Sequence, residues 1–137
     1  MVFAGLAVRA MMPGPMFTEI RLPGSFEEVG RRLEQAVTSV PGWGMPMPAL
    51  DMGSQLAEKG VALEGLRRVK LYFVCNPRFA AKVVGLEPRI TAMMPCTWAV
   101  YELPDGSVRL TTFNMELMRR VMPGAIGRFI GQVARDE

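Results

Sequence analysis

The sequence predicts an α+β domain, in which an antiparallel sheet carries helices packed on one face. Helical periodicity occurs near the two ends of the chain, at residues 25–40 and after residue 114. Between these segments, strand-like stretches follow one another with a hairpin turn between the last two. Consecutive strands of this kind pair antiparallel, because parallel pairing needs a long crossover connection. With 137 residues, half of them hydrophobic, the chain can build one good core.

The first strand and the first helix are the clearest elements. Residues 17–22 alternate in the manner of a strand, and Pro23-Gly24 forms a turn. Ser25 and Glu28 then make a capping box, in which each side chain satisfies a free backbone N–H at the helix start. An apolar stripe at helical spacing runs to residue 40, and Pro41-Gly42 ends the helix.

The middle of the chain alternates between irregular and regular segments. Residues 43–51 contain Gly44, Pro46 and Pro48, so they form at best an irregular edge strand. Residues 54–59 have room for one or two helical turns, and residues 66–75 form a firm strand. Asn76 and Pro77 then favour a helix start, and the helix should end at Gly85.

The last third of the chain reads as a hairpin followed by helix. Residues 96–103 and 107–113 form two strands, joined by the turn Pro104-Asp105-Gly106. Asn114 caps a final helical region that Pro123-Gly124 breaks and that continues to residue 134. We therefore divide the chain into an apolar N-terminal tail, residues 1–15, and a single α+β domain, residues 16–137. The predicted core consists of Phe26, Val29, Leu33, Val37, Leu71, Phe73, Trp98, Val100, Phe129 and Ile130.

Composition excludes several function classes. The chain has no histidine, which removes the usual general base and most zinc sites, and it has no glycine-rich phosphate loop. The net charge of +3 comes with arginine pairs scattered along the chain, so we expect no nucleic-acid binding. The apolar tail is too short to span a bilayer and lacks the basic start of a signal peptide. We expect a cytoplasmic protein; the alternative is a membrane-proximal one held through residues 1–16.

Twelve methionines are unusual for a chain of this size. Methionine fills irregular gaps in cores and interfaces, and this content together with the apolar tail suggests more apolar surface than one small domain can hide. We therefore expect a homodimer, with residues 1–16 or the C-terminal helix at the contact. Met45-Pro46-Met47 and Met93-Met94 could instead contribute to a soft-metal site.

The two cysteines lie in Val74-Cys75-Asn76-Pro77 and Met94-Pro95-Cys96-Thr97. With the strand that follows and the opening Ser25-Phe26-Glu27-Glu28-Val29, these motifs resemble the domain of unknown function 302 family over residues 16–133. The departures are Met94 where leucine is usual, the Pro- and Met-rich residues 45–48, and the Pro123-Gly124 break. The resemblance implies a TATA-binding-protein-like fold of strand, helix, four strands and helix, and a homodimer. It implies no activity.

The cysteine corner is the candidate site. Pairing residues 66–75 with 96–103 so that Cys75 lies opposite Cys96 also sets Phe73 opposite Trp98 and Leu71 opposite Val100, with all three pairs on one face. Cys75 precedes a helix N-terminus, whose partial positive charge favours a thiolate. The candidate ligand-binding residues are Cys75, Asn76, Pro77, Arg78, Pro95 and Cys96.

Three interpretations of this corner stay open. The cysteines could be small core hydrophobes, with Asn76 and Pro77 explained by helix capping. They could also line a small-molecule site, or act as a redox or soft-metal pair, as free thiols. We expect a non-catalytic, dimeric ligand- or partner-binding module; the alternative is a thiol-based redox or metal-binding protein. No cofactor or metal is assigned.

Overall fold

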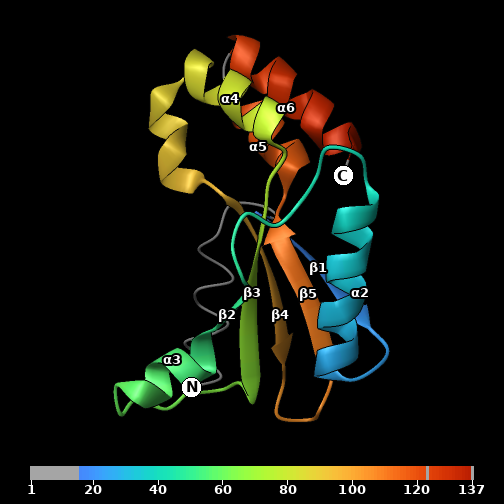
Figure 1. Cartoon of the computed structure of the whole chain (residues 1–137), viewed down its shortest axis with the longest axis vertical. Coiled ribbons are helices and arrows are strands. Elements are labelled where there is room, and N and C mark those ends of the chain that lie inside the picture. Colours follow the sequence, from blue (N-terminus) through green and yellow to red (C-terminus); the bar gives the residue numbers. More distant parts are fainter. Residues whose placement is uncertain (1–15, 123, 137) are drawn as a thin grey trace. The chain divides into compact units, whose positions relative to one another are not determined.

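The computed structural model describes residues 16–122 and 124–136, which form two compact units. One unit holds Glu19–Thr112, and the other combines the start of the first strand with Phe113–Glu137. Figure 1 shows strands and helices together, as expected of an α+β fold. In the described part of the chain no helix is long and apolar enough to cross a bilayer.

The sheet has five strands in the order β1-β5-β4-β3-β2. Central β4 pairs antiparallel with β3 and β5, and β3 pairs antiparallel with β2. This confirms the predicted fold class and the number of strands. The strands are β1 (Phe17–Leu22), β2 (Leu50–Asp51), β3 (Arg68–Val74), β4 (Cys96–Glu102) and β5 (Val108–Phe113).

Helix α2 (Phe26–Ser39) covers one face of this sheet (Figure 1). The capping box forms as predicted: Glu28 N–H donates to Ser25 Oγ at 3.2 Å, and Ser25 N–H donates to Glu28 Oε2 at 3.2 Å. The buried stripe of α2 packs against inward side chains of β3, β4 and β5. This core cluster consists of Phe26, Val29, Leu33, Tyr72, Val100, Val108 and Leu110.

Gly30 lets α2 approach the sheet closely. A Cβ atom built on Gly30 would overlap the Tyr72 hydroxyl and lie 3.2 Å from its Cζ. Tyr72 itself is only 3% exposed. The ring of Tyr72 therefore occupies the space that any side chain at position 30 would need.

The predicted register between β3 and β4 is wrong by one residue. Cys96 pairs with Val74, Trp98 with Tyr72, and Val100 with Lys70. Lys70, Tyr72 and Val74 thus share the face that α2 covers, called here the α2 face. Leu71 and Phe73 point to the opposite, second face and are only half-buried, so their assignment to the core was wrong.

The other core predictions divide into two groups. Val37 and Trp98 are partly buried against the core cluster. Six predicted residues are buried, namely Phe26, Val29, Leu33, Val100, Phe129 and Ile130. The prediction missed Tyr72 and Val74, because they share a face with Arg68 and Lys70, and that face was taken as the outward one.

Shorter helices lie between the strands. Helix α3 (Met52–Glu58) follows β2, and α4 (Pro77–Leu86) follows β3. Gly85 was predicted to end α4, but the helix runs one residue past it. A 3-10 helix, Pro88–Met93, was not predicted; Glu87 caps it by accepting from Arg89 N–H at 3.0 Å.

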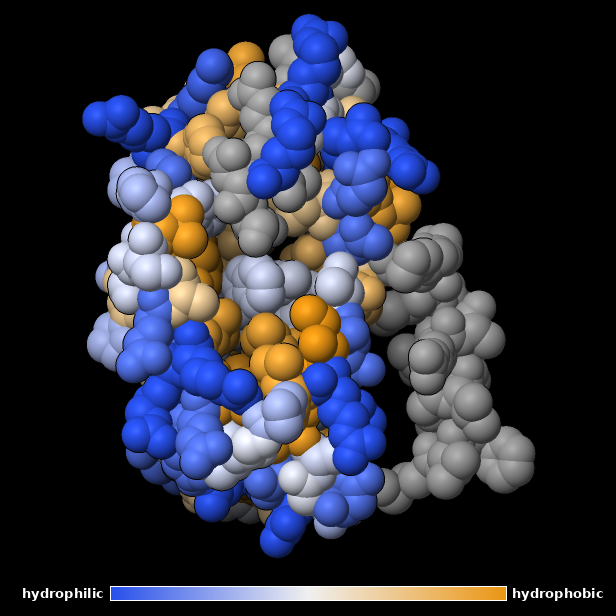
Figure 2. Space-filling model, turned by 90° about the vertical axis from the view of Figure 1, so that its right-hand side faces the viewer, coloured by the Kyte–Doolittle hydropathy of each residue, from blue (hydrophilic) through white to orange (hydrophobic). Residues whose placement is uncertain are grey.

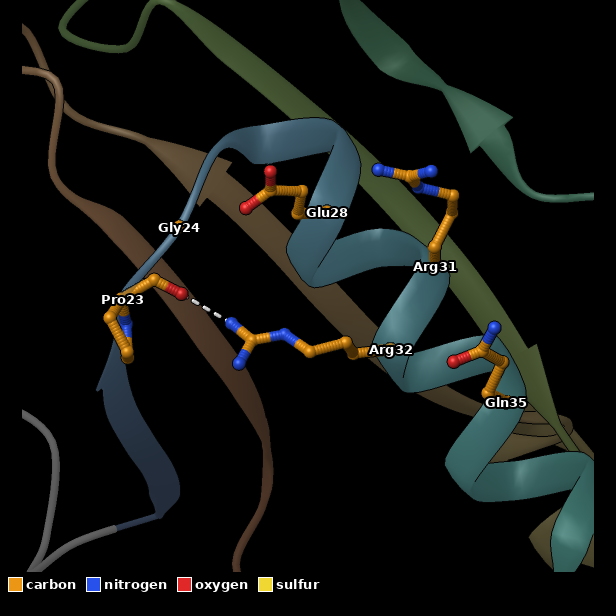
Figure 3. A pocket seen from close by; sticks show the side chains of 6 residues that line it. All are labelled: Pro23, Gly24, Glu28, Arg31, Arg32 and Gln35. Carbon is orange, nitrogen blue, oxygen red and sulfur yellow. Dashed lines mark hydrogen bonds between the residues drawn. The ribbon is translucent and has the colours of Figure 1, made fainter.

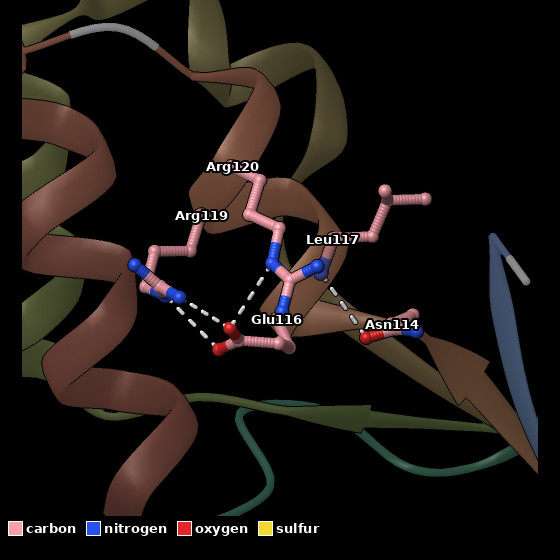
Figure 4. Close-up of polar contacts among 5 residues, drawn as sticks. All are labelled: Asn114, Glu116, Leu117, Arg119 and Arg120. Carbon is pink, nitrogen blue, oxygen red and sulfur yellow. Dashed lines mark hydrogen bonds and ion pairs between the residues drawn. The ribbon is translucent and has the colours of Figure 1, made fainter. Parts of the chain in front are cut away.

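The other unit contains the helical hairpin of α5 (Met115–Val121) and α6 (Gly124–Asp136). As predicted, Asn114 caps α5, and Leu117 N–H donates to its Oδ1 at 3.1 Å (Figure 4). Glu116 binds Arg119 and Arg120, and its hydrogen bond with Arg119 lowers the pKa of Glu116 to about 2.

Glycines set the contact between α5 and α6. A Cβ atom on Gly127 would overlap the Met122 carbonyl oxygen, and one on Gly131 would overlap the Arg119 side chain. Phe129 and Ile130, on the same helix, are buried. The predicted packing of this helix on the sheet stays a prediction, and Pro123 and the Val133 side chain lie outside the described residues.

We predict that Gly30→Ala destabilises the domain by about 1–3 kcal/mol, because the new methyl group overpacks against Tyr72. Urea unfolding measures this change. In a Tyr72→Phe background the cost of the alanine should fall, since the overlapping hydroxyl is absent.

Gly85→Ala is the matched control. Gly85 also lies in a helix, but a Cβ atom there meets nothing within 4 Å. Gly85→Ala should therefore stabilise the protein by about 0.5–1 kcal/mol through helix propensity alone. Equal effects of the two alanines would contradict the role given to Tyr72.

Candidate functional site

Cys75 directly follows β3 and is held by backbone contacts. Its N–H donates to the Gly44 carbonyl at 2.9 Å, and Gly44 N–H donates to the Cys75 carbonyl at 3.0 Å. This bridge keeps the chain extended through Cys75. The irregular segment predicted as an edge strand therefore does pair here, through a single bridge.

Cys96 begins β4 at the same end of the sheet, opposite Val74. It follows Pro95, whose peptide bond with Met94 is cis. The prediction that both cysteines lie on neighbouring strands at one end of the sheet is confirmed. Both side chains are half-buried, and no disulfide joins them.

The two thiols nevertheless face away from each other. Since Cys96 pairs with Val74, it shares the α2 face with Val74, and Cys75, the next residue, points to the second face. The predicted arrangement with both cysteines on one face was wrong for this reason. A ligand or bridge shared by the two sulfur atoms would have to reach through the plane of the sheet.

Burial raises the pKa of the Cys75 thiol above its ordinary value. This is opposite to the effect expected from the following helix N-terminus. The Asn76 side chain already occupies that terminus, because it accepts from Arg78 N–H at 3.1 Å and from Phe79 N–H at 3.4 Å. Desolvation therefore dominates the pKa of Cys75. The raised pKa and the position of the two thiols on opposite faces both count against a reactive thiol pair.

Asn76, Pro77 and Arg78 form the first turn of α4. Pro77 occupies the helix start, where its missing N–H costs nothing. Pro77 and Arg78 are exposed, and Asn76 also contacts Gly42, where a Cβ atom would lie 3.2 Å from Nδ2. Asn76 thus joins the helix to the preceding loop.

The described residues contain no group of three or more Cys, Asp or Glu side chains that could hold a metal ion. On the α2 face, two residues beyond Cys96, the indole N–H of Trp98 is buried without an acceptor among the described residues. Such a donor costs free energy, of the order of 1–3 kcal/mol, unless an acceptor reaches it.

Two shallow hollows lie at the Pro23–Gly24 turn, away from the cysteine motifs in sequence. One, of about 510 Å³, is lined by Pro23, Gly24, Glu28, Arg31, Arg32 and Gln35 (Figure 3). The other, of about 410 Å³, is lined by Arg21, Leu22, Pro23, Gly24, Gly106, Ser107 and Val108. Arg31 and Arg32 are both exposed and form one of the scattered arginine pairs. In the structure Arg32 donates to the Pro23 carbonyl and fixes the turn.

The second face of the sheet was also missed. Alternation along β3, β4 and β5 places on it Val69, Leu71, Phe73, Ala99, Tyr101 and Thr111. Of these six residues only Val69 is buried; the others are half-buried. The apolar alternation of Val69, Leu71 and Phe73 is visible in the sequence, where it was taken as the mark of the core face.

We predict that Cys75 titrates above its ordinary pKa of about 9 in the folded protein. Alkylation rates measured against pH in a Cys96→Ser variant isolate this thiol. In denaturant the titration should return to the ordinary value, because the burial is lost. A thiolate forming below pH 7 would contradict this prediction and revive the redox alternative.

Asn76→Ala should destabilise the protein by about 1 kcal/mol, because α4 loses its N-cap. Asn76→Asp keeps an acceptor at the cap and should retain most of the stability. Chemical unfolding compares the two variants. An unchanged stability in Asn76→Ala would show that capping does not explain this residue.

Comparisons with known proteins address the family and the fold. The family described as domain of unknown function DUF302 matches residues 18–133. A solved structure, an uncharacterized conserved DUF302 protein from Bacillus stearothermophilus, is similar with a TM-score of 0.75 and 20% identity. The similarity covers 88% of this chain and 91% of that one. No curated protein matches. The chain therefore belongs to the DUF302 family, as its cysteine motifs indicated.

Proposed function

We propose that this domain works without catalysis, as a homodimeric module that binds an apolar ligand or partner on the second face of its sheet. The observation that carries the proposal is that Leu71, Phe73, Ala99 and Tyr101 on this face are only half-buried. A sheet normally buries a face of this composition against another layer. Half-buried aromatic side chains on a rigid sheet are suited to flat apolar surfaces.

The cysteine corner supports the non-catalytic part of the proposal. Cys75 has a raised pKa, and the two thiols point to opposite faces. Cys75 lies on the second face, beyond Phe73, so Cys75, Asn76, Pro77 and Arg78 would border a ligand bound there. Pro95 and Cys96 stay candidate residues on the neighbouring strand.

We expect static light scattering at micromolar concentration to give twice the 15.1 kDa mass of one chain. The twelve methionines and the apolar second face support this expectation. The predicted contacts of residues 1–16 fall mostly outside the described residues. A mass of one chain at this concentration would contradict the dimer.

The binding face is tested with 8-anilinonaphthalene-1-sulfonate, a dye that fluoresces on apolar surfaces. Native protein should bind it, and Leu71→Glu should weaken binding about tenfold or more, since a charge then stands among the apolar side chains. Val61→Glu is the matched control, because Val61 is 51% exposed and lies in a loop. Equal effects of the two substitutions would contradict the proposed face.

A further inference from the structure

Strand β1 ends the sheet and leaves one of its edges unpaired among the described residues. All of its residues except Leu22 are exposed, and Ile20 is 47% exposed. On the side of the molecule where α2 and β1 lie, Figure 2 shows hydrophobic surface between hydrophilic side chains. Natural proteins usually blunt such an edge with a proline, a bulge or charged side chains. Residues 17–22 contain no proline, and their two charged residues, Glu19 and Arg21, have opposite signs.

The pairing with β5 fixes which backbone groups face this edge. Asn114 N–H donates to the Met16 carbonyl at 2.8 Å, so the carbonyl of Met16 points toward β5. At the other end of β1, Leu22 and Val108 line one hollow, so the two strands run antiparallel. Backbone groups alternate along a strand, and those of Thr18, Ile20 and Leu22 therefore also point toward β5. The N–H and C=O groups of Phe17, Glu19 and Arg21 point outward.

We propose that the β1 strands of two copies pair antiparallel along this edge, in a register that places Ile20 opposite Ile20 of the second copy. This inference rests on the homodimer proposed above and names its interface. The two copies would be related by a twofold axis that passes between the two Ile20 residues; twofold symmetry is usual in homodimers.

Charge and hydrogen bonding select this register together. It sets Glu19 of each copy opposite Arg21 of the other, so this pair occurs twice by symmetry. The backbone groups of Glu19 and Arg21 both face outward from the sheet edge. Each such pair exchanges two backbone hydrogen bonds and places opposite charges side by side. A shift by two residues would instead oppose Glu19 to Glu19, or Arg21 to Arg21.

The side chains on both faces fit the same register. On the α2 face, Ile20 meets its own copy, and Thr18 meets Leu22. On the second face, Arg21 lies near Asp105 together with Arg109: hydrogen bonds from Ser107 are the main cause that lowers the pKa of that carboxyl, and the charges of both arginines add to it. Two arginine charges thus lie near one carboxylate, and Glu19 of the second copy would add a second negative charge beside Arg21. Pro23 has no N–H and limits the ladder at its end.

Exchange of the charges tests the register. Glu19→Arg alone and Arg21→Glu alone should each weaken dimerisation about tenfold, because each sets like charges opposite one another twice. The double variant Glu19→Arg/Arg21→Glu should recover the affinity of the original protein. Sedimentation equilibrium measures all four dissociation constants, and these exposed positions can change without loss of the fold.

A cysteine in the interface supplies a second measurement. Directly opposite residues without mutual hydrogen bonds have Cα atoms about 4.5 Å apart, within the range of a disulfide. In a Cys75→Ser/Cys96→Ser background, Ile20→Cys should therefore form a covalent dimer under mild oxidation. Thr18→Cys, on the same strand and face, should not, since the two copies of position 18 lie several residues apart.

The outcomes separate this inference from the proposed function. If the unmodified protein is monomeric, the homodimer and this interface are both wrong. If it is dimeric but neither single charge variant weakens it, the dimer stands and the β1 interface is overturned. Weakening without recovery in the double variant, or a covalent dimer through Thr18→Cys, would overturn the register.

Discussion

The contact between Tyr72 and Gly30 sets the geometry on which the rest of the Glu19–Thr112 unit depends. The tyrosine ring lies where a side chain at position 30 would be, so α2 can approach the sheet only because that position is glycine. Because strand side chains alternate between the two faces, the inward position of Tyr72 also fixes the face of all the remaining residues of β3. One close contact thus decides which residues form the core and which form the second face.

The same alternation explains why the cysteine corner differs from its prediction. Tyr72 and Val74 point toward α2, so Cys75 points away, while Cys96 pairs with Val74 and follows it inward. The residues that follow Cys75 have local structural reasons: Asn76 caps α4, and Pro77 fits its first turn. The polar capping atom also removes the free N–H groups that could have stabilised a Cys75 thiolate.

Much of the fold could be predicted from local signals. The capping box of α2, the Asn76-Pro77 helix start and the Pro104–Gly106 turn each act within a few residues, and the structure confirms them. The register could not be predicted in this way, because the alternation of β3 favours the opposite parity: Val69, Leu71 and Phe73 are apolar, whereas the α2 face of the strand begins with two charged residues. The deciding partner, Gly30, lies in a helix about forty residues away in sequence. There it reads as an unfavourable helix residue and not as a packing position.

The edge and the second face of the sheet have a common physical origin. Among the described residues, α2 packs on one face of the five-stranded sheet, apolar side chains stay half-buried on the other face, and the outermost strand β1 has backbone groups without partners. Pairing of two β1 strands would satisfy the edge and would also join the two second faces into one continuous surface, because a twofold axis perpendicular to the sheet keeps like faces together. A dimer built in this way doubles the apolar surface that a ligand or partner could contact. The interface would then create the binding surface rather than cover it.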